Sequence, residues 1–365
     1  MANDLLYQIA LTLIPNIGSV QAKTLLAHFG DAESVFKASR KKLEAIEQIG
    51  SVRAGSIKTF EDFATAEKEI EFITRYKIHP LFITDKNYPQ RLLNCFDAPV
   101  LLYYRGNTPL NTSRVVSIIG TRSCTDYGKQ FTEKFVADLR EQQVLVVSGL
   151  AFGIDAIAHK AAVQNNLPTV GVLAHGLDCI YPPKHRNLAK DMLQNGGLLT
   201  EFRQDAKPDK HNFPRRNRIV AGMADATIVI ETAIKGGSMI TAELARNYNR
   251  DVFALPGRIT DSKSDGCNYL IKHNHAVLLT DAKQLMETLG WQQKKVSPKT
   301  QQSLFNDLSK DEALIVEILR QKEHTHVDEL FLKSGLSSSS VAAAMLNLEL
   351  QAVITSLPGK IIRLN

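Results

Sequence analysis

The sequence predicts an α/β protein whose central domain is a doubly wound parallel sheet, with a helical domain before it and a second small domain after it. From Arg114 onward, short apolar runs rich in β-branched residues alternate with helical segments. Most runs are continuously apolar, as expected for strands covered by helices on both faces of a parallel sheet. The predicted strands are residues 115–119, 144–147, 169–173, 197–200, 227–231, 252–255 and 276–279, and the helices between them include 128–140, 154–164 and 241–248.

The first segment, residues 1–75, is predicted to be a small helical domain because it contains an internal repeat. Residues 14–22 read IPNIGSVQA and recur at 46–54 as IEQIGSVRA. Each copy predicts a turn with glycine and then a helix start capped by serine. The repeat resembles the helix-hairpin-helix unit, whose N–H groups at a helix start can hold a DNA phosphate. The usual first glycine of that hairpin is Asn16 or Gln48 here, so a purely structural helical domain stays open as the alternative.

After the central domain, residues 76–291, the sequence predicts a polar linker over 292–309 and a winged helix over 310–365. Three short helices and a hairpin around Pro358-Gly359 are the basis for the winged helix; the segments are 311–320, 327–333 and 337–350, then 352–356 and 360–364. From Lys310 to the end the chain has six Lys and Arg against seven Asp and Glu, and the presumptive recognition helix, 337–350, has neither Lys nor Arg. A DNA-reading helix normally carries cations. We therefore expect this domain to contact protein.

The composition indicates a globular protein of the reducing cytoplasm. The 365 residues carry a formal charge of +6, which permits an anionic partner, and no apolar stretch is long enough for a membrane helix. The N-terminus has no secretory pattern. The four cysteines lie far apart with no C-x-x-C pair, and His273-Asn274-His275 is too short to be a ligand set, so no metal and no cofactor are expected.

Three loops of small residues each follow a predicted strand and open a helix. Glycines let the backbone approach an anion, and a helix start supplies N–H donors and partial positive charge. Right-handed crossovers place all three loops at the carboxyl edge of the sheet. This edge is therefore predicted to bind phosphate through Gly120, Thr121, Arg122, Ser148, Gly149, Gly236, Gly237 and Ser238.

Two further segments after strands of the same sheet bring cations. Because these clusters follow the strands that carry the glycine loops, they favour a groove for a polyanion. The aromatic residues Phe152, Tyr181 and Phe213 lie among them and could stack bases, although core packing is the simpler interpretation of each. The additional candidate contacts are Lys184, Arg186, Arg215, Arg216, Asn217 and Arg218.

Long ordered motifs in the central domain resemble the DNA-processing protein A (DprA/Smf) family. They are SGLAFGIDAIAH at 148–159, GLDCIYP at 176–182, FPRRNRIVAG at 213–222, GSMITA at 237–242 and LPG at 255–257. The resemblance is close over about residues 80–280, and the repeat and the winged helix are also similar, less specifically. One departure is Asn274-His275 in place of a usual Gly-Ala; Asn tolerates the left-handed conformation, which would preserve the turn.

The resemblance implies a Rossmann-like domain that binds single-stranded DNA without catalysis, forms a homodimer, protects incoming DNA and helps load RecA during natural transformation. It also makes Arg122 the leading phosphate contact. The alternative is an enzyme of the phosphoribohydrolase type on the same fold, in which Glu243, after Gly236-Gly237, would promote cleavage of an N-glycosidic bond. No Walker A sequence is present, which disfavours a P-loop ATPase.

Overall fold

The computed structural model describes residues 2–291, 308–322, 324–351, 353–357 and 361–364. The chain divides into two compact units, Met1–Trp291 and Gln292–Asn365. Most of the predicted linker, 292–309, lies outside the described residues, as does the turn at Pro358-Gly359.

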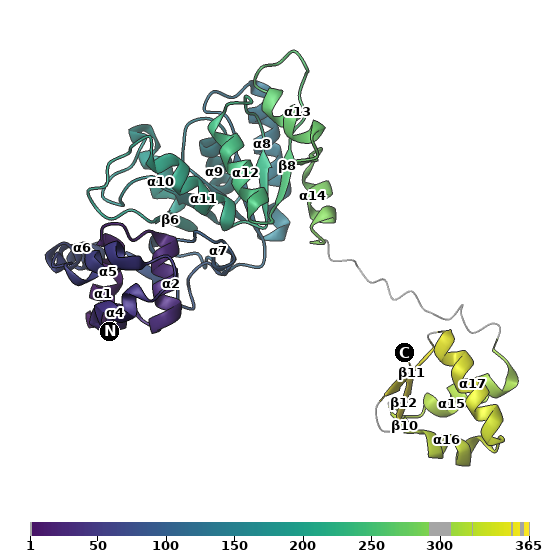
Figure 1. The fold of residues 1–365 in the computed structure, drawn as a ribbon. Helices are drawn as coiled ribbons and strands as arrows, with labels where there is room; N and C mark the ends of the chain where they lie inside the picture. Colours follow the sequence, from purple (N-terminus) through teal and green to yellow (C-terminus); the bar gives the residue numbers. More distant parts are fainter. Residues whose placement is uncertain (1, 292–307, 323, 352, 358–360, 365) are drawn as a thin grey trace. The chain divides into compact units, whose positions relative to one another are not determined.

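The first unit contains a nine-stranded sheet, of which β6 and β8 are labelled in Figure 1. The strand order is β1-β2-β6-β5-β4-β3-β7-β8-β9. The seven strands from β6 to β9 in this order are parallel, and β1 and β2 are antiparallel additions beside β6. All seven predicted strands are present. The strands are β1 His79–Phe82, β2 Leu101–Gly106, β3 Val115–Ile119, β4 Leu145–Ser148, β5 Thr169–Val172, β6 Gly196–Thr200, β7 Ala226–Val229, β8 Asp251–Ala254 and β9 Val277–Leu278.

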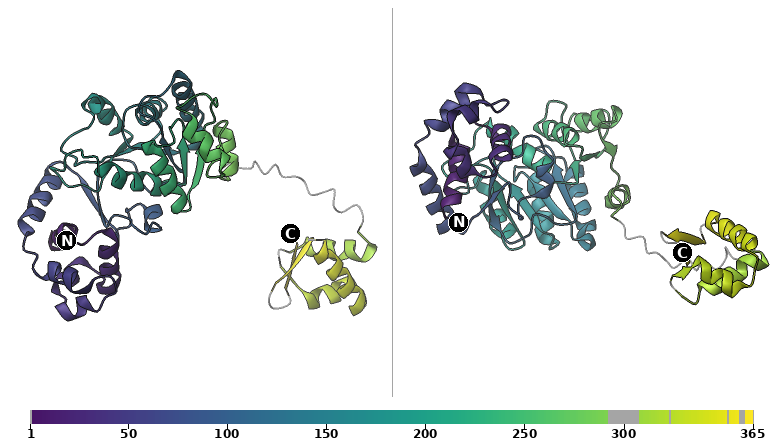
Figure 2. Two further views of the ribbon diagram at one scale, coloured as in Figure 1. Left: turned by 45° about the horizontal axis from the view of Figure 1, so that its top comes forward. Right: turned by 60° about the horizontal axis from the view of Figure 1, so that its bottom comes forward.

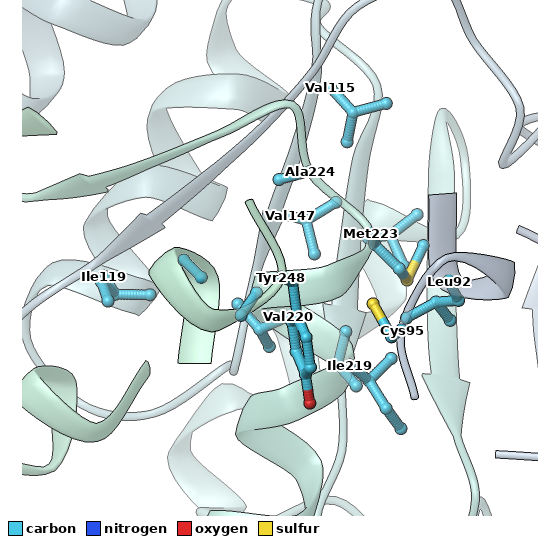
Figure 3. Packing of buried hydrophobic residues seen from close by; sticks show 14 of the residues in the cluster. Leu92, Cys95, Val115, Ile119, Val147, Ile219, Val220, Met223, Ala224 and Tyr248 are labelled. Carbon is cyan, nitrogen blue, oxygen red and sulfur yellow. The ribbon is translucent and has the colours of Figure 1, made fainter. Parts of the chain in front are cut away.

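Helices cover both faces of this sheet, so the predicted Rossmann-like, doubly wound architecture is confirmed. Alternate residues of β3 point into different cores: Val115 and Ile119 pack on one face, and Val116 and Ile118 on the other. The first core includes residues of helices α7, α11, α12 and α13. Figure 3 shows part of it, with Leu92 of α7 near Ile219 and Val220 of α11. The helices of this region are α7 Gln90–Leu93, α8 Asp126–Asp138, α9 Ile154–Gln164, α10 Arg186–Met192, α11 Asn212–Gly222, α12 Gly237–Asn247, α13 Asp265–Lys272 and α14 Ala282–Thr288.

The strand order reverses at β3. From β3 the chain moves outward through β4, β5 and β6, then returns to β7 on the other side of β3. The crossovers that leave the neighbouring strands β3 and β7 therefore run in opposite directions, and the loops after these two strands diverge. Ligands of open α/β sheets bind at such a point, outside the carboxyl ends of the strands.

Strands β1 and β2 are not apparent from the sequence pattern, and they connect the N-terminal helices to the sheet. Phe82 of β1 and Leu101 and Tyr103 of β2 belong to the same core as the helices before them. The head and the sheet thus form one compact unit, with the head helices beside β1 and β2 (Figure 2). The head helices are α1 Ala2–Leu13, α2 Ser19–Phe29, α3 Ala32–Lys37, α4 Arg40–Glu44, α5 Gly50–Lys58 and α6 Phe63–Arg75.

The repeat forms two matching hairpins in the head. Asn16 and Gln48, which stand where the hairpin usually has its first glycine, adopt φ of 65° and 67° in the left-handed region. The departure in sequence therefore keeps the backbone shape that glycine would adopt. The predicted serine caps are wrong: α2 is preceded by Gly18 and α5 by Ile49, and neither helix has a side-chain cap. Asn274 also has a left-handed φ, 55°, so the turn predicted there is preserved.

Glu69 of α6 joins the head to the loop after β6 through a buried carboxylate. Its two oxygens accept the Gln204 backbone N–H at 3.1 and 3.2 Å. Burial raises the pKa of Glu69 to about 7, because desolvation outweighs the hydrogen bond from Gln204. A folded pKa above the unfolded value means that the folded protein retains this proton between about pH 4.5 and 7. The free energy of unfolding therefore falls as the pH rises through that window.

We expect Glu69→Gln to raise the free energy of unfolding at about pH 8, by roughly 1–3 kcal/mol, because the amide removes the cost of ionising a buried group. The gain should vanish at about pH 4, where the wild-type carboxyl is protonated. Thermal unfolding of both proteins at the two pH values measures this difference. Glu67→Gln, an exposed change on the same helix, is the control. An equal effect of Glu69→Gln at both pH values would contradict the titration.

The second unit is a winged helix. Its helices are α15 Lys310–Leu319, α16 Val327–Ser334 and α17 Ser338–Leu350, close to the predicted segments. The strands are β10 Thr325–His326, β11 Ile354–Leu357 and β12 Ile361–Leu364, in the order β10-β12-β11, so the predicted hairpin gains a third short strand. Ser309 caps the start of α15 in a capping box: its hydroxyl accepts from the Glu312 N–H, and its own N–H donates to the Glu312 carboxylate.

Candidate nucleic-acid interface

A cleft of about 770 Å³ opens where the loops after β3, β4 and β7 meet. It lies at the reversal of strand order and also reaches α11 and α12. Nine of the fourteen predicted site residues line it: Gly120, Thr121, Arg122, Gly149, Arg216, Asn217, Gly236, Gly237 and Ser238. Ser148, Lys184, Arg186, Arg215 and Arg218 are not among the lining residues.

The loop after β3 presents one cation to this cleft. Gly120 permits close packing, because a Cβ there would lie 2.6 Å from Cγ1 of Ile154. The Thr121 N–H is already used, since it donates to the Glu231 carbonyl at 2.7 Å. Arg122 is exposed, and its guanidinium carbon lies 5.2 Å from the centre of the Phe213 ring, a cation–π distance. Arg122 can therefore offer its donors to a phosphate while it packs on an aromatic face.

The loop after β4 is filled by the protein itself. Ser148 is fully buried and donates its hydroxyl to the Ile118 carbonyl at 2.6 Å. The N–H groups of Gly149 and Ala151 donate to the Asp155 carboxylate at 3.1 and 3.4 Å. Asp155 thus occupies the position that an anion would take at the start of α9. The glycine pattern predicted three open phosphate loops, but the donors of this one are satisfied internally.

Arg216 lies beneath the loop after β4 as a buried cation. Its Nη1 donates to the carbonyls of Gly149 and Val172, and its Nε donates to the Asn217 side chain at 3.1 Å. A Cβ at Gly149 would lie 2.3 Å from the guanidinium, so only glycine fits above it. Burial lowers the pKa of Arg216 to about 10, with the attraction of Asp155 opposing the shift. The group therefore stays charged at neutral pH and adds positive potential to the floor of the cleft.

The loop after β7 leaves a helix start open. Helix α12 follows Gly236 with no side-chain cap and has no acidic residue in its first turn. The Ser238 hydroxyl bonds to that of Thr232 at 2.6 Å, which holds the loop, while a Cβ at Gly237 would meet nothing within 4 Å. By contrast, the Thr125 side chain caps α8. Of the three helix starts, that of α12 is the one whose first-turn donors neither a side-chain cap nor an acidic group satisfies.

The segment after β5 presents Lys184 and Arg186 as exposed side chains outside the cleft lining. Between them, buried His185 bonds through Nδ1 to the Leu150 carbonyl at 2.9 Å. Leu150 itself has a left-handed φ of 55°, which is unusual for a bulky residue and is held by its neighbours. This segment therefore stabilises the loop after β4 and holds two cations beside the cleft.

Arg215 and Arg218 lie on the side of α11 that faces the head. Both pair with the Glu201 carboxylate: Arg215 at 3.4 Å, and Arg218, which is buried, more closely. Neighbouring residues of one basic cluster thus lie in three environments. Arg216 lies beneath the cleft, Arg215 and Arg218 lie beside Glu201, and Asn217 is part of the cleft lining. These side chains point in different directions because they lie on one turn of a helix, and the sequence pattern alone does not show the direction of each.

One cation of the cleft was not predicted. Lys210 is exposed and lines it, but it stands in a mixed-charge segment, KPDK at 207–210, that gives no signal in sequence. Two aromatic residues considered from the sequence, Tyr181 and Phe213, also line the cleft, with ring centres 6.4 Å apart. Cations and aromatic faces together suit a polymer of phosphates and bases.

The candidate enzyme carboxylate is not in the cleft. Glu243 lies exposed on α12 and is not among the lining residues, whereas the carboxylate that does line the cleft, Asp155, is committed to backbone N–H groups. Within the described ranges, no group of three or more His, Cys, Asp or Glu side chains could hold a metal ion. Among those same residues, no helix is both long and apolar enough to cross a membrane.

The fold and the cleft define a class: Rossmann-like proteins with a cation-lined, glycine-rich cleft at the strand-order reversal. The family model described as DNA recombination-mediator protein A matches residues 79–290, and the models for the DprA winged helix domain and the helix-hairpin-helix motif match residues 298–360 and 8–70. The chain belongs to the DNA recombination-mediator protein A family, which is also called DNA processing protein A.

Relatives and solved structures agree with this assignment. Protein Smf of Synechocystis is 32% identical over 98% of both chains, and the DNA processing protein DprA of Streptococcus pneumoniae is 43% identical over 56% of this chain and 72% of its own length. The X-ray structure of the pneumococcal protein matches with a TM-score of 0.67 at 33% identity, covering 77% of this chain and 97% of that one. A structure described as showing the single-stranded DNA binding mode of the Helicobacter pylori protein matches with a TM-score of 0.54 at 34% identity, covering 59% and 96%.

Proposed function

We propose that this protein binds single-stranded DNA in the cleft, without catalysing a reaction on it. The observation that carries the proposal is that the cleft joins an uncapped helix start at Gly237 to the exposed cations Arg122 and Lys210. Phosphates would lie along these groups, and bases could stack on Tyr181 and Phe213. The binding described for the Helicobacter pylori protein supports the same ligand class.

The geometry favours single strands over duplex. The cleft is lined by loops and helix starts, and the described part of the winged-helix domain's α17 carries no Lys or Arg to enter a major groove. A flexible single strand can follow a winding edge, whereas a stiff duplex cannot.

We expect the purified protein to bind an oligonucleotide at least tenfold more tightly as a single strand than as a duplex of the same length, about 1.4 kcal/mol. Titrations across a salt series measure both affinities, and the logarithmic slope gives the number of neutralised phosphates, about 0.7 for each. Equal or tighter binding to the duplex would overturn the proposal.

The phosphoribohydrolase alternative predicts release of free base from nucleoside monophosphates. The position of Glu243 outside the cleft lining argues against it. Incubation with each monophosphate, with Glu243→Gln as the control, distinguishes the two functions. Base release that the variant lacks would favour the enzyme.

The remaining steps rest on the family resemblance. We propose that the protein acts in the cytoplasm as a homodimer, protects incoming DNA and helps load RecA during natural transformation. We also retain as proposals the domain boundaries 1–75, 76–291, 292–309 and 310–365, with the near-neutral last domain as a protein-contact module. Sedimentation of the full chain with and without RecA and single-stranded DNA tests self-association and partner binding separately.

A further inference from the structure

A second groove, of about 550 Å³, lies between the first hairpin of the head and the helices α11 and α12. Neither its position nor its lining follows from the sequence, because it joins residues about 200 positions apart. The residues that line it are Gly18, Ser19, Val20, Gln21, Asp97, Pro214, Arg215, Arg218, Ile240 and Leu244. We call it the hairpin groove.

The hairpin groove adjoins the cleft. Pro214 at the start of α11 and Ile240 on α12 line both hollows. A chain that leaves the cleft over Pro214 and Ile240 would therefore reach the hairpin groove directly, because these two residues border both hollows. Since Ile240 is 44% exposed, it offers an apolar surface at the junction.

Arg218 lines this groove and has a hydrogen-bond donor, Nη1, that is not satisfied within the described residues. It is 9% exposed, and one amino group pairs with Glu201, but its Nη1 has no hydrogen-bond partner among the described residues. A buried guanidinium donor without a partner costs free energy that an anionic acceptor would recover. Oε1 of Glu201 also has no hydrogen-bond partner among the described residues. The ion pair between Glu201 and Arg218 therefore does not satisfy the Nη1 group of Arg218.

The opposite wall is the start of α2. This helix has eleven residues, follows exposed Gly18 without a side-chain cap, and has no acidic residue in its first turn. Its first residues line the groove, and the N–H groups of this turn carry partial positive charge. Gln21 bonds through its side chain to the Gly18 N–H at 3.1 Å, which fixes the hairpin but leaves the later donors of the turn.

The charge balance of the lining also favours an anion. Arg215 has a side chain that is 58% exposed and is only loosely paired with Glu201, at 3.4 Å. The nearby carboxylate of Asp97 already accepts a hydrogen bond from the Tyr248 hydroxyl at 2.6 Å. Arg215, Arg218 and the helix start thus outweigh Glu201 and Asp97.

We propose that the hairpin groove is a second phosphate-binding site, which takes the backbone of a single strand as it leaves the cleft over Pro214 and Ile240. This inference rests on the proposed function and extends it: the bound strand runs from the sheet edge to the head, where Arg215, Arg218 and the first turn of α2 contact its phosphodiesters. Short strands would fill only the cleft, and longer strands would use both sites.

Two variants test the groove without breaking the fold. Arg215→Ala removes an exposed cation. Ser19→Asp places a carboxylate in the first turn of α2, where it favours the helix and repels phosphate. Arg218 is unsuitable, because its removal would leave the Glu201 carboxylate buried and unpaired. Lys42→Ala, an exposed cation of the head that lines neither hollow, is the control.

Affinity is measured for single strands of about 6 and about 15 nucleotides, within the range of site sizes of single-strand grooves. Arg215→Ala and Ser19→Asp should each weaken binding of the longer strand about three- to tenfold, leave the shorter one unchanged, and flatten the salt dependence of the longer by about 0.7. Lys42→Ala should change neither.

Two failures are distinguishable. If the unaltered protein binds neither strand, the proposed function is wrong, and the proposal for the hairpin groove is wrong as well. If the longer strand binds and loses affinity in Arg122→Ala but not in Arg215→Ala or Ser19→Asp, the cleft stands and the groove is not part of the path.

Discussion

Arg216→Ala should lower the free energy of unfolding of the first unit by about 3–5 kcal/mol, the range expected when the loss of one buried charge leaves another uncompensated. The side chain is 5% exposed and holds the carbonyls of Gly149 and Val172, which belong to neighbouring strand ends. Its loss would also leave buried Asp155 without the cation that opposes the rise of its pKa. Urea unfolding followed by fluorescence of the single tryptophan, Trp291 at the end of this unit, measures the change.

Three further variants sharpen this result. Arg215→Ala, the exposed neighbour, should change the free energy of unfolding by less than about 0.5 kcal/mol. Arg216→Lys should recover little, because an ammonium lacks the planar fork of the guanidinium. Adding Asp155→Asn to Arg216→Ala should recover part of the loss, since the amide removes the uncompensated charge but still accepts from Gly149. A loss below about 1 kcal/mol in Arg216→Ala would show that the cation is not structural.

Reversing the two exposed cations of the cleft should abolish most DNA binding. In Arg122→Glu/Lys210→Glu the cleft loses two positive charges and gains two negative ones, and neither side chain forms a salt bridge in the described structure. We expect affinity for a single strand to fall at least a hundredfold near 0.1 M salt, and the logarithmic salt slope to flatten by about 1.4, or 0.7 for each phosphate lost.

The single variant Arg122→Ala should flatten the slope by about 0.7 without unfolding the protein. The matched control for the double reversal is Lys41→Glu/Lys42→Glu, which makes the same change of net charge on α4 of the head. If the control lost as much affinity as Arg122→Glu/Lys210→Glu, overall charge rather than the cleft would govern binding.

Local patterns that depend on a single element were predicted well. The seven parallel strands are continuous apolar runs between helices, and α9 begins and ends at the predicted residues, 154 and 164. Strands β1 and β2 were missed because they are antiparallel additions that precede the regular alternation of strands and helices, and because β1 contains Pro80. Their packing against the head depends on contacts far apart in sequence.

The candidate site was predicted in outline but not in detail. The glycine loops meet at one edge of the sheet, as expected, because crossover handedness brings them together. The sequence could not show that the Asp155 carboxylate accepts hydrogen bonds from the loop after β4. This contact forms only once the first turn of α9 places Asp155 beside Gly149. It likewise could not show that Lys210, in a segment without a pattern, reaches the cleft.

By itself, the sequence determined the parallel sheet, its covering helices and the edge at which the glycine loops gather, because hydrophobic periodicity and chain handedness act locally. Only the tertiary structure decided which cations are available. Arg216 is buried beneath the cleft, Arg218 lies beside Glu201, and Arg122 remains exposed. The physical reason is that burial and charge pairing depend on neighbours from other strands and helices. The sequence of a basic cluster does not specify those neighbours.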